Sequence, residues 1–165
     1  MAVTDRIHTS VVATETLVQA IGHTARDPLS DISTLELTSG TGGSQADVIW
    51  HDQRTLGSSA SEDLDLAGSL TSALGASVFA RVTVLLVRAA ATNTVDLQVS
   101  RPANGAPFFA AEGDGLALPP GGQLLLSMGA SSSAVAITAG TGDLLRVTAG
   151  AAASTYDVVV IGTSA

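Results

Sequence analysis

Cysteine is absent from the 165 residues, which excludes a disulfide framework, thiolate catalysis and zinc bound through sulfur. Lysine is absent as well, and the seven basic residues are arginines scattered along the chain. Fifteen carboxylates outnumber them and give a formal net charge of −8. Because the neutralisation of phosphates supplies most of the affinity for nucleic acid, this charge balance argues against a nucleic-acid partner.

Long apolar runs and an export signal are also missing. No stretch approaches the roughly 18 uninterrupted apolar residues that a membrane-spanning helix needs, so we expect no membrane partner. The N-terminus lacks the charged-then-apolar layout of a signal peptide, because Asp5 and Arg6 interrupt it early. The sequence therefore predicts a protein that is made in the cytoplasm.

Short segments of alternating apolar and polar residues fill the chain from Ala46 onward, and glycine, proline, asparagine or serine ends each of them. Val78–Arg88 has apolar residues on both faces, which is typical of a central strand or of one pressed against a neighbouring subunit. Ser69–Gly75 is expected to form one capped helical turn. About eight or nine such strand segments at roughly 8–12-residue spacing predict an all-β fold, an antiparallel β-sandwich or jelly-roll-like domain over residues 29–165.

The first 45 residues lack the regular strand pattern of the rest of the chain. The apolar residues between Val11 and Ile21 fit either a short amphipathic helix or two extended pieces, and their periodicity does not decide between the two. Residues 25–30 are typical of a turn, because Pro28 disfavours a helical residue before it. We expect residues 1–28 to form an N-terminal arm or peripheral segment.

No catalytic set of residues is evident. His51 and Asp52 are an adjoining base and acid, but successive residues of a strand point to opposite faces. The glycine-rich residues 40–43 lack the lysine of a phosphate loop, and no serine stands in a nucleophile elbow. We expect no enzyme activity and no cofactor; the enzymatic alternative is a hydrolase in which Asp63 and Asp114 converge in one cleft.

Glu62, Asp63 and Asp65 form the densest acidic cluster, and carboxylate oxygens are ligands that calcium and magnesium prefer. Alternation along a strand places both aspartates on a solvent-exposed face, which accounts for them without a metal. The twelve-residue loop of a dedicated calcium site is missing as well. We predict no metal site here.

The adjacent Phe108 and Phe109 are the candidate contact with another protein. Pro107 before them belongs at the start of a strand or at an edge. Two neighbouring strand residues do not face the same core, so at least one ring needs a second partner. A subunit interface is one candidate; the alternative is that one ring packs in the core while the other is exposed at an edge.

Several strand and turn segments of the predicted sandwich have sequences similar to those of known proteins. The relevant stretches are WHDQRTL (50–56), SEDLDLAGSLT (61–71), VFARV (78–82), PPGG (119–122), GTGDLL (140–145) and YDVVVIG (156–162). Together they resemble small virion structural proteins of tailed bacteriophages, namely head decoration or cement proteins and minor capsid proteins. None of these stretches is catalytic.

The resemblance implies a non-enzymatic β-sandwich module on the exterior of the phage head, made in the host cytoplasm. Such a module binds the major capsid protein, stabilises the head and is a homotrimer. Proteins of this kind send an N-terminal arm across a neighbour, which suits residues 1–28. The resemblance assigns no individual binding residue.

The alternative function is a glycan- or host-binding β-sandwich module of a phage fibre, spike or tail. Sugar-binding surfaces use exposed aromatic rings beside polar groups. Trp50 and Tyr156 are the suitable rings, and both lie in predicted strands that account for them as core residues.

Overall fold

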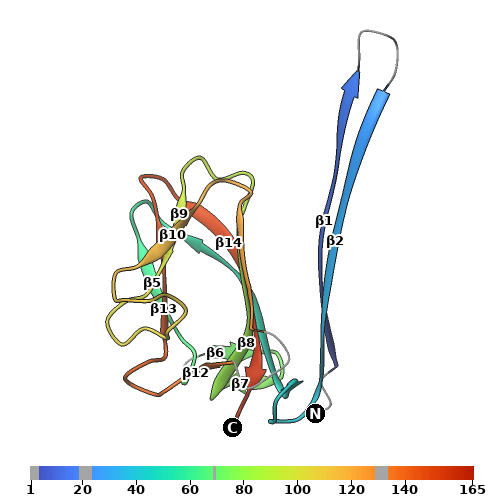
Figure 1. Cartoon of the computed structure of the whole chain (residues 1–165). Helices are drawn as coiled ribbons and strands as arrows, with labels where there is room; N and C mark the ends of the chain where they lie inside the picture. The colour runs from blue at the N-terminus through green and yellow to red at the C-terminus, as the bar shows by residue number, and fades with distance from the viewer. Residues whose placement is uncertain (1–3, 19–23, 69, 129–133) are drawn as a thin grey trace.

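The computed structural model describes residues 4–18, 24–68, 70–128 and 134–165. All regular elements of these residues are β-strands, and they form a β-sandwich and a long hairpin that projects beside it (Figure 1). The expectation of an all-β fold built on an antiparallel sandwich is therefore confirmed. The narrower jelly-roll expectation stays a prediction.

Two antiparallel sheets make up the sandwich. The first, here the β8 sheet, has the order β11-β8-β14-β4, and β12 pairs with β8 beside it. The second, here the β9 sheet, has the order β10-β9-β13-β5. The bounds of the strands in the β8 sheet are β4 (Val48–Leu56), β8 (Arg81–Ala89), β11 (Gln123–Ser127), β12 (Val135–Ala136) and β14 (Ser154–Thr163); those in the β9 sheet are β5 (Ser61–Asp65), β9 (Leu97–Ser100), β10 (Gly115–Leu118) and β13 (Leu144–Ala149).

The core of the sandwich lies between the inner faces of these two sheets. Trp50 from β4 and Tyr156 from β14 are its largest fully buried side chains, as the alternation of their strands predicts. Strand residues at every second position contribute much of the rest, including Leu85, Val87, Leu97, Val99, Leu145, Val147, Val158 and Val160. Burial of these residues is the main source of the stability of the sandwich.

The central pair of strands β8 and β14 is partly buried on its outer face as well. Val84 and Ile161 lie opposite each other and form a second, smaller cluster with Leu37 and Ala46. Thr83 has no register partner on β14 and forms a β-bulge. Because of this extra residue, the side chain of Val82 lies on the inner face of the sheet, in the main core. The apolar residues on both faces of Val78–Arg88 thus mark a central strand.

The hairpin consists of β1 (Asp5–Val18) and β2 (Thr24–Ser39), paired without interruption from Asp5 opposite Leu37 to Val18 opposite Thr24. The short strand β3 (Gln45–Ala46) pairs in parallel with the end of β2 and connects the hairpin to the sandwich. Only the base of the hairpin is covered, because Ile7, Leu35 and Leu37 pack in the smaller cluster. From residue 8 to residue 34 every described hairpin residue whose side-chain burial is assigned is exposed.

Residue 28, at which the expected arm ends, lies in the middle of β2, and the hairpin continues to Ser39. The turn expected at residues 25–30 is wrong, because Pro28 lies opposite Thr14 within the hairpin ladder. Proline is tolerated in a strand whose outer edge is unpaired. The extended alternative for the residues after Val11 is confirmed up to Val18; Ile21 lies outside the described residues.

The helical turn expected at Ser69–Gly75 is also wrong for the described residues 70–75. They belong to a second, small hairpin of β6 (Leu70–Ser72) and β7 (Gly75–Ser77). Gly75 has a φ of 114°, which a residue with a side chain rarely adopts, so the glycine closes a two-residue β-turn. Glycine is also common directly after a helical turn, so its presence does not distinguish a helical turn from a β-turn.

Two leucines on the same face of β2 test the assignment of the hairpin base. We expect Leu37→Ala to lower the free energy of unfolding by about 2–5 kcal/mol, because Leu37 is 1% exposed and its loss leaves a cavity. Leu29→Ala is the matched control, expected to change it by less than about 0.5 kcal/mol because Leu29 is 54% exposed. Chemical denaturation measures both; equal losses would show that the whole hairpin is part of the folded core.

Candidate functional site: the hairpin arm and the groove beside it

The hairpin carries most of the exposed large apolar side chains among the described residues. Five of its large apolar side chains are more than half exposed: Val11, Val12, Leu17, Leu29 and Ile32. An isolated two-stranded hairpin is at best marginally stable in water, because neither of its faces is covered. This arm therefore has the properties of a segment that another chain covers in an assembly.

The two faces of the arm differ in charge. Residues on one face of a hairpin have the same parity in each strand, and here the register places odd-numbered residues opposite odd-numbered ones. The odd-numbered face, residues 5–17 and 25–37, carries Asp5, Glu15, Asp27 and Asp31 and no arginine or histidine. The even-numbered face instead carries Arg6, His8, Arg26 and Glu36, with an ion pair of 3.1 Å between Arg6 and Glu36.

A groove of about 440 Å³ separates the lower part of the arm from the outer face of the β8 sheet. Five consecutive residues of β1, 6–10, line one side, which means that the edge of the strand and not one face borders the groove. β1 is the edge strand of its sheet, so its outward N–H and C=O groups have no strand beside them. The opposite side is formed by Val84, Leu86, Arg88, Gln123, Leu125, Val159 and Ile161.

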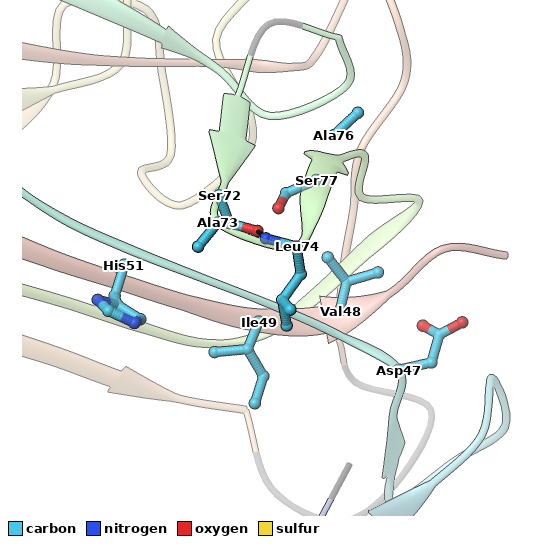
Figure 2. A pocket seen from close by; sticks show the side chains of 9 residues that line it. All are labelled: Asp47, Val48, Ile49, His51, Ser72, Ala73, Leu74, Ala76 and Ser77. Carbon is cyan, nitrogen blue, oxygen red and sulfur yellow. Dashed lines mark hydrogen bonds between the residues drawn. The ribbon is translucent and has the colours of Figure 1, made fainter. Parts of the chain in front are cut away.

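A second cleft, of about 360 Å³, lies between β4 and the β6–β7 hairpin (Figure 2). Ile49 and Leu74 approach each other across it, while His51 lies farther along β4 and Asp47 lies just before the strand. Leu74 is 76% exposed at the tip of the small hairpin. Asp52 does not join His51 in this cleft, because its carboxylate accepts a hydrogen bond of 2.9 Å from Arg54.

The predicted acidic cluster is occupied by ion pairs and hydrogen bonds within the chain. Arg146 donates two hydrogen bonds of 2.7 Å to the two oxygens of Asp63. Glu62 accepts one of 2.8 Å from Arg54 and one of 2.7 Å from the Tyr156 hydroxyl. Asp65 accepts one of 3.0 Å from the Ala67 amide. Asp63 and Glu62 thus hold β5 against β13 and β4, and Asp65 stabilises the turn after β5, so the positions of all three are explained structurally.

Asp114, the other carboxylate of the hydrolase alternative, stabilises a turn. It accepts a hydrogen bond of 2.8 Å from the Ala111 amide in the loop that precedes β10. No ion pair or hydrogen bond joins it to Asp63, which is paired with Arg146 on the β9 sheet. Among the described residues there is no group of three or more His, Asp or Glu side chains that could hold a metal ion.

Phe108 and Phe109 lie in the loop between β9 and β10, not in a strand that begins at Pro107. Both rings are half-buried and both pack against the main core. The loop is held by Arg101, which donates a hydrogen bond of 3.0 Å to the carbonyl of Phe109. In a loop two neighbouring side chains can reach the same core, so the geometric reason for assigning one ring to an interface does not apply. Their contact with another protein stays a prediction.

Comparison of the chain with protein-family models, curated proteins and solved structures finds no match. In the part of the chain that the structure describes, no helix is long and apolar enough to cross a membrane. The resemblance to virion structural proteins and the partners that it implies therefore stay predictions.

Tyr156 tests the buried polar network behind β5. Burial, together with the hydrogen bond to Glu62 and its negative charge, raises the pKa of Tyr156 well above its usual range, so the hydroxyl stays a donor. We expect Tyr156→Phe to lower the free energy of unfolding by about 1–3 kcal/mol, because one oxygen of a largely buried carboxylate loses its donor. Thr155→Val is the control, since it removes an exposed hydroxyl bonded to Thr55. An equal effect of both in chemical denaturation would contradict this role.

Asp5 at the hairpin base tests the pH dependence of the arm's attachment. Its Oδ2 is buried and has no hydrogen-bond partner among the described residues, and burial raises the pKa of this carboxyl above its usual 3.8. A raised folded-state pKa means that the ionised form weakens the fold as pH rises through that value, and that the cost disappears at lower pH. We expect Asp5→Asn to stabilise the protein at pH 7 and to have no effect at a pH below 3.8, where the carboxyl is protonated in both the folded and the unfolded chain. Asp27→Asn, at an exposed position of the same face, should leave the unfolding free energy unchanged at both pH values.

Proposed function

We propose that this chain is a non-enzymatic virion structural protein of a tailed bacteriophage, a decoration or cement protein that binds the major capsid protein on the head exterior. The observation that carries the proposal is the exposed arm β1–β2. Its strand β1 of 14 residues is about 45 Å long at roughly 3.3 Å per residue, and only its base packs on the sandwich. An uncovered arm of this length suits a protein whose partners lie beside it in an assembly.

The arm gives such a protein its means of attachment. The sandwich folds around its own core, while the arm presents apolar side chains on both faces and an unpaired strand edge. A homo-oligomer, which the resemblance implies is a trimer, would engage several capsid subunits at once. Attachment of one arm makes the next contact intramolecular and raises the effective concentration. The net charge of −8 repels packaged DNA, which suits a position on the outside of the shell.

The alternative, a glycan-binding module, lacks the aromatic platform on which it depended. Trp50 is 1% exposed and the Trp50 indole donates a hydrogen bond of 3.1 Å to the Thr71 carbonyl. Tyr156 is fully buried. Neither ring is available for stacking on a sugar, so no observation on the described surface favours this function.

Shortening the arm tests the proposed function. Residues 10–32 are replaced by Asn-Gly, a two-residue turn that joins the opposed Thr9 and Ser33 and retains the packed base. We expect the free energy of unfolding to change by less than about 1 kcal/mol, because the removed described side chains are exposed. Binding to undecorated phage heads, measured by co-sedimentation, should weaken by about tenfold or more, because the contacts of the arm are lost.

Leu116→Ser is the control for loss of an exposed apolar side chain, since Leu116 lies on β10, outside the arm. It should bind heads as the unaltered chain does. Failure of the full chain to associate with heads at any concentration would overturn the proposal. Undiminished binding by the shortened chain would show that the sandwich, and not the arm, makes the attachment.

A further inference from the structure

The sheet side of the groove combines an apolar floor with an arginine that has no partner. Val84, Leu86 and Val159 are among the apolar residues of this floor. Arg88 is exposed and makes no ion pair or side-chain hydrogen bond with any described residue. Its cross-strand neighbour Asp157 instead accepts a hydrogen bond of 2.9 Å from Gln53. The floor thus presents apolar surface and one available positive charge.

The odd-numbered face of the arm has the complementary chemistry. Beyond its packed base it carries apolar side chains, Val11, Leu17 and Leu29 among them, all exposed. Between them lie Glu15, Asp27 and Asp31. Their side chains make no ion pair or hydrogen bond with a described residue. At the base the same face already packs on the floor's lower end, through Ile7, Leu35 and Leu37. This face is therefore suited to the outer side of the β8 sheet.

We propose that the groove receives the β1–β2 arm of a second copy of this chain. The entering arm would lay its odd-numbered face on the apolar floor and bring its carboxylates to Arg88. Its strand edge would pair with the free edge of β1 at residues 6–10, so that the hairpin sheet continues across the groove. The inference rests on the proposed function only in treating the arm as the assembly segment, and it names another copy of the chain as a partner.

A second copy is needed because an arm cannot place its outer part in the groove at its own base. The ladder from Asp5–Leu37 to Val18–Thr24 is unbroken, so the outer part of the arm cannot fold back on itself without losing that pairing. Hinging at the residues after Ser39 would bring only the lower part of an arm onto its own sheet. The competing occupants are therefore the chain's own lower arm and a strand of another protein, and the experiment separates them.

Disulfide trapping in the cysteine-free background tests the proposal directly. One tagged chain carries Arg88→Cys and a second, differently tagged chain carries Asp27→Cys or Glu15→Cys. Mild oxidation of the mixture should give a cross-linked species that contains both tags. The matched control pairs the same arm variants with Arg81→Cys, an exposed position at the start of β8 that does not line the groove. Cross-linking at Arg81 with equal yield would show that trapping is non-specific and would overturn the proposal.

Charge reversal tests the same contact through the strength of self-association, without a covalent cross-link. Arg88→Glu should weaken self-association by about tenfold or more in sedimentation equilibrium, because like charges then meet in a partly desolvated groove. Arg81→Glu should leave it unchanged. Mixing Arg88→Glu chains with Asp27→Arg/Asp31→Arg chains should recover association, since each mixed contact again joins opposite charges.

The outcomes distinguish this inference from the proposed function. A chain that stays monomeric at all concentrations, or that cross-links only within one molecule in the Arg88→Cys/Asp31→Cys variant, overturns the arm exchange. If such a chain still binds heads, the proposed function stands and the groove serves a capsid strand instead. If the chain self-associates through Arg88 but never binds heads, the arm exchange stands and the proposed function fails.

Discussion

The strand pair β8–β14 has to bury both of its faces, and the rest of the molecule is arranged around that requirement. Its inner face, with Val87 and Val158, closes the sandwich core. Its outer face, with Val84 and Ile161, would be an apolar patch in water if the base of the hairpin did not cover its lower end. The cover is partial, since only the base of the arm packs on it. The groove is the uncovered remainder of the same face.

The sequence predicts the sandwich well because period-two alternation is a local signal of burial. Trp50 and Tyr156 were assigned to the core, and both are fully buried. Val78–Arg88 was recognised as buried on both faces, and β8 is central. The sequence left open whether a strand of its own chain or a neighbouring subunit covers such a strand, because both give the same apolar pattern.

The errors have separate physical causes. Pro28 is predicted in a turn but lies in β2, where the outer edge of the strand is unpaired and proline is tolerated. Gly75 is predicted at a helix end but closes a β-turn, because glycine suits both positions. Pro107 precedes a loop rather than a strand, so Phe108 and Phe109 share the core. The groove was not predicted at all. The segregation of acids onto odd-numbered positions of the arm was readable in the sequence, but only once the two strands are known to pair in that register.

An open strand edge beside exposed valines and leucines is also a template for stacking with unwanted chains. The arm carries features that oppose this. Glu15, Asp27 and Asp31 place like charges at intervals along one face, so identical arms stacked in register would repel each other. Pro28 has no amide hydrogen and interrupts any ladder that would form along the outer edge of β2. The same acids that suit a groove containing one arginine thus also oppose the stacking of exposed arms into fibrils.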